Sequence, residues 1–133
     1  MLYIPVSSLR LIMVVISSQI SVFCFSGPLR SAGHTATVVT GRLNKKSERM
    51  IVIFGHSPVY GYLNTVQEYQ FGTRDWKIIT TQGYPVKGGY GHSAAWDQLS
   101  QRIYVYGGFA SESTSTSVLS SKLYSFEPST HTW

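Results

Sequence analysis

Short apolar segments separated by polar turns run along most of the chain and predict β-strands. The clearest two are MIVIFG (Met50 to Gly55) and RIYVYG (Arg102 to Gly107), which are apolar on both alternating faces. This pattern is typical of an inner strand that neighbours cover on each side. Eight strands are predicted, near residues 34–40, 50–55, 64–71, 75–80, 92–96, 102–107, 121–126 and 131–133.

The order of these segments repeats once along the chain, and this repetition is the most informative property of the sequence. GHTATVVT returns as GHSAAWD, MIVIFG returns as RIYVYG, and VQEYQFGTRDW returns as LYSFEPSTHTW. The copies differ in length within polar segments, where loops tolerate insertions at small entropic cost. We therefore expect one repeat at residues 27–80 and a second at residues 81–133.

Landmark residues assign equivalent positions in the two copies. The pairs are His34 and His92, Gly55 and Gly107, Tyr69 and Phe126, and Trp76 and Trp133, with offsets of 58, 52, 57 and 57 residues. Matching Gly55 to Gly107 places His56 opposite Gly108. We therefore expect His56 to occupy a backbone position with positive φ, where glycine is unstrained and His is tolerated at some cost.

A known repeat carries the same features. A glycine pair that closes the second strand, followed by an aromatic residue and then a Trp with six residues between, is similar to the kelch repeat, which forms one blade of a β-propeller. IVIFGHSPVYGYLNTVQEY and GGYGHSAAWDQLSQRIYVYGG resemble, more narrowly, the kelch region of attractin and attractin-like proteins. The resemblance implies an all-β fold with two four-stranded antiparallel kelch blades of an incomplete β-propeller.

The landmark residues then have mainly structural roles. Gly107 and Gly108 let the backbone leave a crowded inner strand and approach the next blade closely. The two landmark Trp side chains are expected to fill the space between successive blades. The two landmark His residues each precede a small hydroxyl residue, and we expect both to make the same repeated hydrogen bond.

Two blades do not close a propeller, because closed rings of this class use about 4–8 blades. An open pair exposes strand edges and the apolar faces between blades. We therefore expect a fragment, a shortened isoform, or a piece that needs further kelch blades. Attractin-like proteins carry other extracellular modules around the propeller, so any membrane association would come through missing parts of the parent protein.

The first 26 residues differ in kind from the rest. A single basic residue, Arg10, precedes an apolar run from Leu11 to Phe25, and small residues stand at Cys24 and Ser26, two positions apart, before Gly27. This arrangement resembles a secretory signal peptide. The run falls short of the ~20 apolar residues that span a membrane. A non-domain leader is the alternative interpretation of these residues. A signal peptide would direct the chain through the secretory pathway, so the expected location is the cell exterior or its membrane, with the cytoplasm as the alternative.

Composition limits the partners. The chain has a net charge of +5, and its clearest basic cluster comprises Arg42, Lys45, Lys46 and Arg49. We interpret this cluster as a solvated hairpin tip and, second, as a contact for an acidic partner. Nucleic-acid binding is not expected, because the sequence shows no basic face with stacking aromatics and no groove-reading helix. The single cysteine excludes an internal disulfide framework.

Catalytic and metal-binding patterns are absent from the sequence. It holds no H-E-x-x-H, G-x-S-x-G, P-loop or dinucleotide fingerprint. The four histidines, at positions 34, 56, 92 and 131, do not form a spaced ligand motif. We therefore expect a protein that is not an enzyme and needs no cofactor or metal.

Two binding functions remain. The first is a protein-interaction module in an extracellular attractin-like propeller, and the second is an intracellular kelch adaptor for a cytoskeletal or ubiquitin-ligase client. Propellers bind through exposed loops at one rim, and the loop after the second strand is the expected contact. Its candidate contact residues in the first repeat are His56, Ser57, Pro58, Tyr60 and Tyr62, and the equivalent loop in the second repeat runs from Phe109 to Val118.

Overall fold

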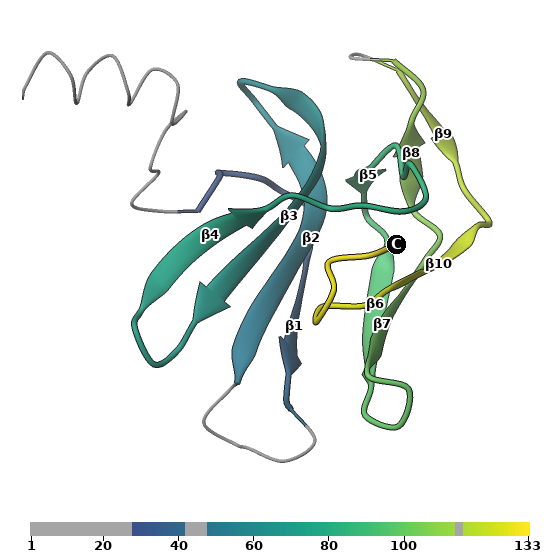
Figure 1. Cartoon of the computed structure of the whole chain (residues 1–133). Helices are drawn as coiled ribbons and strands as arrows, with labels where there is room; N and C mark the ends of the chain where they lie inside the picture. Colours follow the sequence, from purple (N-terminus) through teal and green to yellow (C-terminus); the bar gives the residue numbers. More distant parts are fainter. Residues whose placement is uncertain (1–27, 42–47, 114–115) are drawn as a thin grey trace, which may run out of the picture.

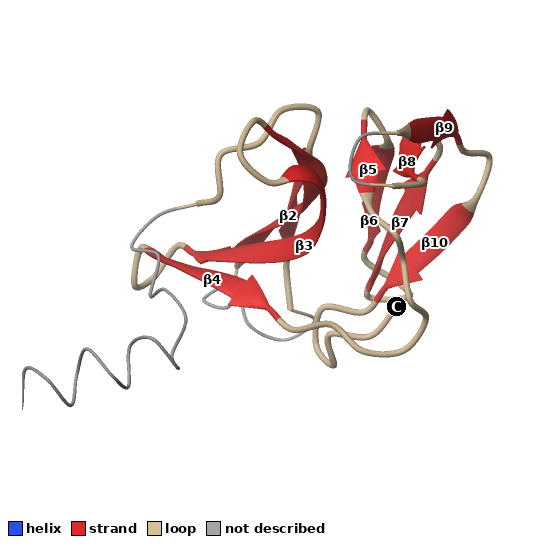
Figure 2. Cartoon of the chain, turned by 90° about the horizontal axis from the view of Figure 1, so that it is seen from above, coloured by secondary structure: helices blue, strands red, loops and turns tan. Residues whose placement is uncertain are grey.

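The computed structural model describes residues 28–41, 48–113 and 116–133, and every regular element in these ranges is a β-strand (Figures 1 and 2). The predicted leader at residues 1–26 lies outside the described residues. Within them, no helix has the length and apolar character needed to cross a membrane. The all-β fold class is therefore confirmed.

The first blade is a four-stranded antiparallel sheet in which each strand pairs with the next along the chain. Its strands are β1 (Thr35–Val39), β2 (Arg49–Ser57), β3 (Gly61–Gln70) and β4 (Asp75–Ile79). Figure 1 shows β1 nearest the second blade and β4 farthest from it. All four predicted strands are present here, although β2 and β3 reach further toward their common turn than the sequence pattern indicates.

The second blade consists of two smaller sheets. The sheet β10-β7-β6 matches the body of the first blade. The sheet β5-β8-β9 extends the blade beyond Gly107 and Gly108, where β7 has ended. Their strands are β5 (Gly89–Tyr90), β6 (Ser93–Asp97), β7 (Arg102–Tyr106), β8 (Phe109–Ser111), β9 (Ser117–Leu119) and β10 (Leu123–Phe126). The strand predicted at 131–133 is not formed; Thr132 makes only isolated bridges, to Glu127 and to Gln82.

Strand registers correct the alignment of the two repeats by one residue. The register pairs are Thr35 with Ile53, Met50 with Tyr69, Ser93 with Tyr106 and Ile103 with Phe126, so β7 follows β2 by 53 residues. Gly55 therefore matches Gly108, and Phe54 matches Gly107. All four have positive φ, at 116° and 74° for the first pair and 54° and 73° for the second. The expected positive φ at His56 was wrong, because His56 pairs with Tyr62 in the ladder between β2 and β3.

The matched glycines allow the same close backbone approach in both blades. A Cβ atom on Gly55 would lie 3.1 Å from the Ala32 carbonyl oxygen, and one on Gly108 would lie 2.7 Å from the Tyr90 carbonyl oxygen. On Gly108 it would also lie 2.5 Å from the backbone nitrogen of His92. A side chain at either position would therefore push apart two backbone segments.

The hydrophobic core lies between the two blades. Its buried members are Val39, Ile51, Ile53, Phe54 and Val66 from the first blade, and Ile103, Val105 and Phe126 from the second. Trp133 joins them, with ring centroids 5.3 Å from Phe54 and 4.8 Å from Phe126. Trp76 is half-buried on the first blade, where its ring lies 5.1 Å from that of Tyr69.

Candidate functional site

The hairpin turns of the two blades lie at the same end of the molecule. Figure 1 shows the turn between β2 and β3 and the small sheet β5-β8-β9 at the top, on neighbouring blades. The turn itself covers residues 58–60, since His56 and Ser57 belong to β2 and Tyr62 to β3. The predicted loop from His56 to Tyr62 is thus shorter than expected. The predicted loop from Phe109 to Val118 likewise contains β8 and the start of β9.

Ser57 fixes the shape of the turn. It is 3% exposed, and its Oγ accepts hydrogen bonds from the backbone nitrogens of Val59 at 3.3 Å and Tyr60 at 3.4 Å. Val59 and Tyr60 are 79% and 59% exposed. Ser57 therefore holds the backbone, while the two neighbouring apolar side chains face solvent. Val59 was absent from the predicted contact set, although an apolar residue between Pro58 and Tyr60 in a turn is itself a signal.

A row of four aromatic rings extends from this turn across both blades. We call the side chains of His56, Tyr62, Tyr90 and Phe109 the aromatic row. The centroid distances are 5.1 Å from His56 to Tyr62, 5.6 Å from Tyr62 to Tyr90, and 5.2 Å from Tyr90 to Phe109. The last two pairs are stacked, with interplanar angles of 7° and 14°. Tyr62 therefore connects the blades as well as bordering the turn.

The two landmark histidines were expected to make equivalent hydrogen bonds in the two repeats. This expectation was wrong, because each bonds to a different kind of partner. His92 is 8% exposed, and its Nε2 lies 2.9 Å from Thr35 Oγ1 in the other blade. Burial lowers the pKa of His92 below its usual value, against an opposing hydrogen bond with the Ile53 backbone. His34 is exposed, and its Nδ1 lies 3.1 Å from the Ser31 carbonyl oxygen.

Of the predicted basic cluster, only Arg49 lies among the described residues. Arg42, Lys45 and Lys46 lie outside the described residues. Arg49 lies in β2, where it forms an ion pair with the buried carboxylate of Glu68 at 3.1 Å. It also donates a hydrogen bond to the Pro128 carbonyl oxygen of the second blade at 3.0 Å. Arg49 therefore joins the blades and is not a free cation at a hairpin tip.

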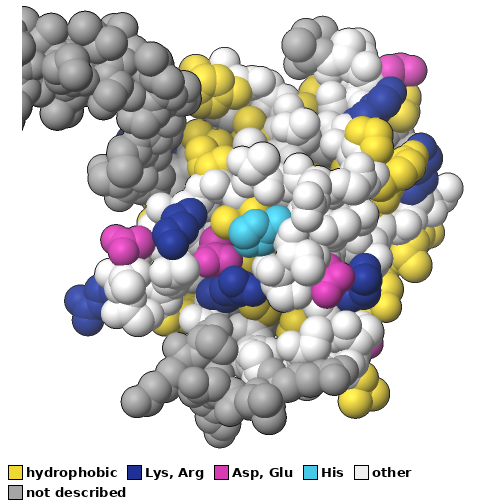
Figure 3. Space-filling view, viewed as in Figure 1, with side chains coloured by type: hydrophobic (Ala, Val, Ile, Leu, Met, Phe, Trp, Pro, Cys, Tyr) yellow, Lys and Arg dark blue, Asp and Glu magenta, His cyan; other side chains and the backbone are white. Residues whose placement is uncertain are grey.

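Hydrophobic side chains are also exposed on the second blade. Figure 3 shows them over β9 and β10, with basic side chains among them. Val118, Leu119 and Leu123 are 47%, 78% and 63% exposed. In the part of the chain that the structure describes, no group of three or more His, Cys, Asp or Glu side chains could hold a metal ion.

Comparison with known proteins identifies the family. Residues 15–133 match the family model described as the Attractin/LZTR1 beta-propeller. Multiple epidermal growth factor-like domains protein 8 from Mus musculus and from Homo sapiens is 32% identical over 102 residues, covering 77% of this chain and 3% of the relative. Putative protein tag-53 from Caenorhabditis elegans is 35% identical over 111 residues, covering 81% of this chain and 7% of the relative.

The chain thus spans a small part of the length of these relatives. The kelch repeats, the attractin resemblance and the incomplete propeller expected from the sequence are confirmed by the family match and by the antiparallel sheets. The chain belongs to the attractin/LZTR1 β-propeller family.

Proposed function

We propose that this chain is part of an extracellular propeller that binds other proteins through the turn at residues 58–60 and the adjoining aromatic row. The observation that carries the proposal is the pair of exposed apolar side chains, Val59 and Tyr60, on a turn that buried Ser57 holds in place. A fixed turn loses little conformational freedom on binding. Tyr is enriched among the residues that dominate binding energy at protein interfaces.

The family supports an interaction role over an enzymatic one. The chain belongs to a β-propeller family, and propellers bind partners through exposed loops at one rim. The names of two relatives refer to multiple epidermal growth factor-like domains. Such domains belong to the small disulfide-rich class of secreted proteins. Together with the signal-like residues 1–26, this favours an extracellular site, while an intracellular kelch adaptor is the alternative that the first test below distinguishes.

Compartment is the first test of the proposal. The full chain with a C-terminal tag is produced in cultured animal cells, and its mass is measured in the medium, the membrane fraction and the cytosol. We expect product in the medium or membrane fraction with a mass reduced by removal of the leader. Cytosolic product that retains residues 1–26 would contradict the extracellular site and favour the adaptor.

Binding through the turn is the second test. The tagged chain is screened against a panel of purified receptor ectodomains, and affinities of reproducible binders are measured for Tyr60→Ala. We expect about tenfold weaker binding, equal to ~1.4 kcal/mol, because truncation removes an exposed anchor. Leu99→Ala is the matched control, since Leu99 is an 82% exposed apolar residue on the β6–β7 turn. Equal affinities for Tyr60→Ala and the parent chain, or a large loss of stability, would refute the role of the turn.

A further inference from the structure

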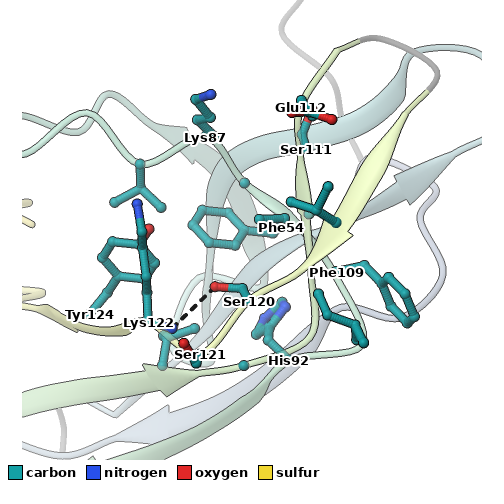
Figure 4. A pocket seen from close by; sticks show the side chains of 18 of the residues that line it. Phe54, Lys87, His92, Phe109, Ser111, Glu112, Ser120, Ser121, Lys122 and Tyr124 are labelled. Atoms are coloured by element: carbon teal, nitrogen blue, oxygen red, sulfur yellow. Dashed lines mark hydrogen bonds between the residues drawn. The ribbon is translucent and has the colours of Figure 1, made fainter.

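A cavity of about 290 Å³ lies next to the aromatic row, in the second blade, with Phe54 of the first blade at its base (Figure 4). Phe54 from the first blade and Val105 and Tyr124 from the second line it, together with Phe109 of the aromatic row. Ligand pockets for drug-sized molecules begin at about 300 Å³. The size of this cavity therefore suits one side chain or a similarly small group.

The cavity follows from a difference between the two blades. In the first blade, β2 and β3 continue past a bulge between Ile53 and Gly55 as one long hairpin. In the second blade, Gly107 and Gly108 interrupt the matching strands, and β8 and β9 form a separate sheet. The two sheets of the second blade diverge at this break, and the ring of Phe54 lies between them in the view of Figure 4. Phe54 is 4% exposed, so it forms a fixed apolar floor.

Positive charge borders the cavity. Lys87 and Lys122 both line it and are exposed. Among the described residues, neither lysine makes an ion pair. Figure 4 shows Lys122 beside Tyr124 and Lys87 above Phe54, with Glu112 also at the upper rim. The cavity therefore combines an apolar interior with two available cations, in a chain whose net charge is +5.

We propose that this cavity binds an apolar side chain of a protein partner whose neighbouring residues are acidic. The apolar side chain lies against Phe54 and Val105, and the adjacent carboxylates pair with Lys87 and Lys122. Burial of the side chain supplies affinity, and the charge pairing supplies orientation and selectivity for acidic partners. The inference rests on the proposed function, because it specifies the chemistry of a partner that contacts the same end of the propeller.

A further blade would leave this cavity open. Val105 faces the first blade and is buried there, whereas its neighbours Tyr104 and Tyr106 are exposed on the opposite face of the second blade. Successive strand residues point to opposite faces of a sheet. A blade that covers Tyr104 and Tyr106 therefore packs on the face opposite the cavity.

A synthetic peptide tests the proposal directly. The probe is capped, fluorescein-labelled Gly-Glu-Phe-Glu-Gly, and its binding to the full chain is followed by fluorescence anisotropy. We expect about tenfold weaker binding for the double variant Lys87→Glu, Lys122→Glu, because attraction becomes repulsion. Ser121→Trp should have a similar effect, since Ser121 is an exposed cavity-lining residue and the indole would fill the space. Arg30→Glu, which changes an exposed cation away from the cavity, should leave binding unchanged.

Three comparisons make the result decisive. The proposal is overturned if Gly-Glu-Gly-Glu-Gly binds as well as the Phe peptide, or if the lysine and Ser121 variants, with unchanged melting temperature, keep the parental affinity. Tyr60→Ala should leave peptide binding unchanged, which separates the cavity from the turn. Peptide binding without any ectodomain binder refutes the proposed function alone, and Tyr60-dependent ectodomain binding without peptide binding refutes the cavity alone.

Discussion

The position after the buried part of the second strand carries Phe54 in the first blade and Gly107 in the second. Both residues have positive φ, although only glycine adopts this conformation without strain. The Phe54 ring compensates by burial, since it stacks on Trp133 and meets His92 edge-on at 5.4 Å. The first blade thus keeps a strained residue where its ring closes the interface between blades.

Gly108, the residue after Gly107, has no room for a side chain. Its substitution therefore tests the close backbone approach at this position. Gly108→Ala places a Cβ against backbone atoms and forces Ala into a left-handed conformation, which alone costs about 1–2 kcal/mol. We expect the free energy of unfolding of the full chain, measured by urea denaturation, to fall by at least this amount. Gly72→Ala is the control, because no atom lies within 4 Å of its added Cβ and its φ is not positive, and it should be neutral or slightly stabilising. Equal effects of the two substitutions would argue against the close approach at Gly108.

At the scale of strands, alternation and repetition were sufficient to predict seven of the eight expected segments as strands. The errors concern the glycines at the end of the second strand in each repeat. MIVIFG and RIYVYG align equally well with either glycine of the pair, and only cross-strand pairing shows that Gly55 matches Gly108. The split of the second blade into two sheets was also missed, because Gly107 and Gly108 read as the end of a strand and β8 is only three residues long.

The candidate site was predicted only in part for a related reason. The sequence pattern located the turn and the exposed Tyr60, which depend on local residues. Tyr90 and Phe109 join Tyr62 only through contacts between blades, which no local pattern encodes. The same limit applies to Arg49, whose charge suggested a solvated loop until its contacts with Glu68 and Pro128 placed it between blades.

At the scale of the whole molecule, the described residues cover the second blade on one face only. Its uncovered face carries the residues that match the buried face of the first blade, at the offsets set by the strand registers. Tyr104, Tyr106 and Leu123 are 37%, 55% and 63% exposed, whereas the matching Ile51, Ile53 and Val66 are 1%, 0% and 0% exposed. Repeats of this kind bury their apolar faces against neighbours, so we expect a further blade to pack on this face.

Without that neighbour, the exposed face should drive association of the isolated chain. We expect sedimentation velocity to show a weight-average mass that rises with concentration, because contiguous apolar surface promotes contact between molecules. The double variant Tyr104→Glu, Tyr106→Glu should shift the chain toward monomer, since association would bury two unpaired carboxylates. Val59→Glu changes an apolar residue of the turn that is more exposed than either tyrosine, and it should leave association intact. A parent chain that stays monomeric, or equal effects of the two variants, would show that this face does not drive association of the isolated chain.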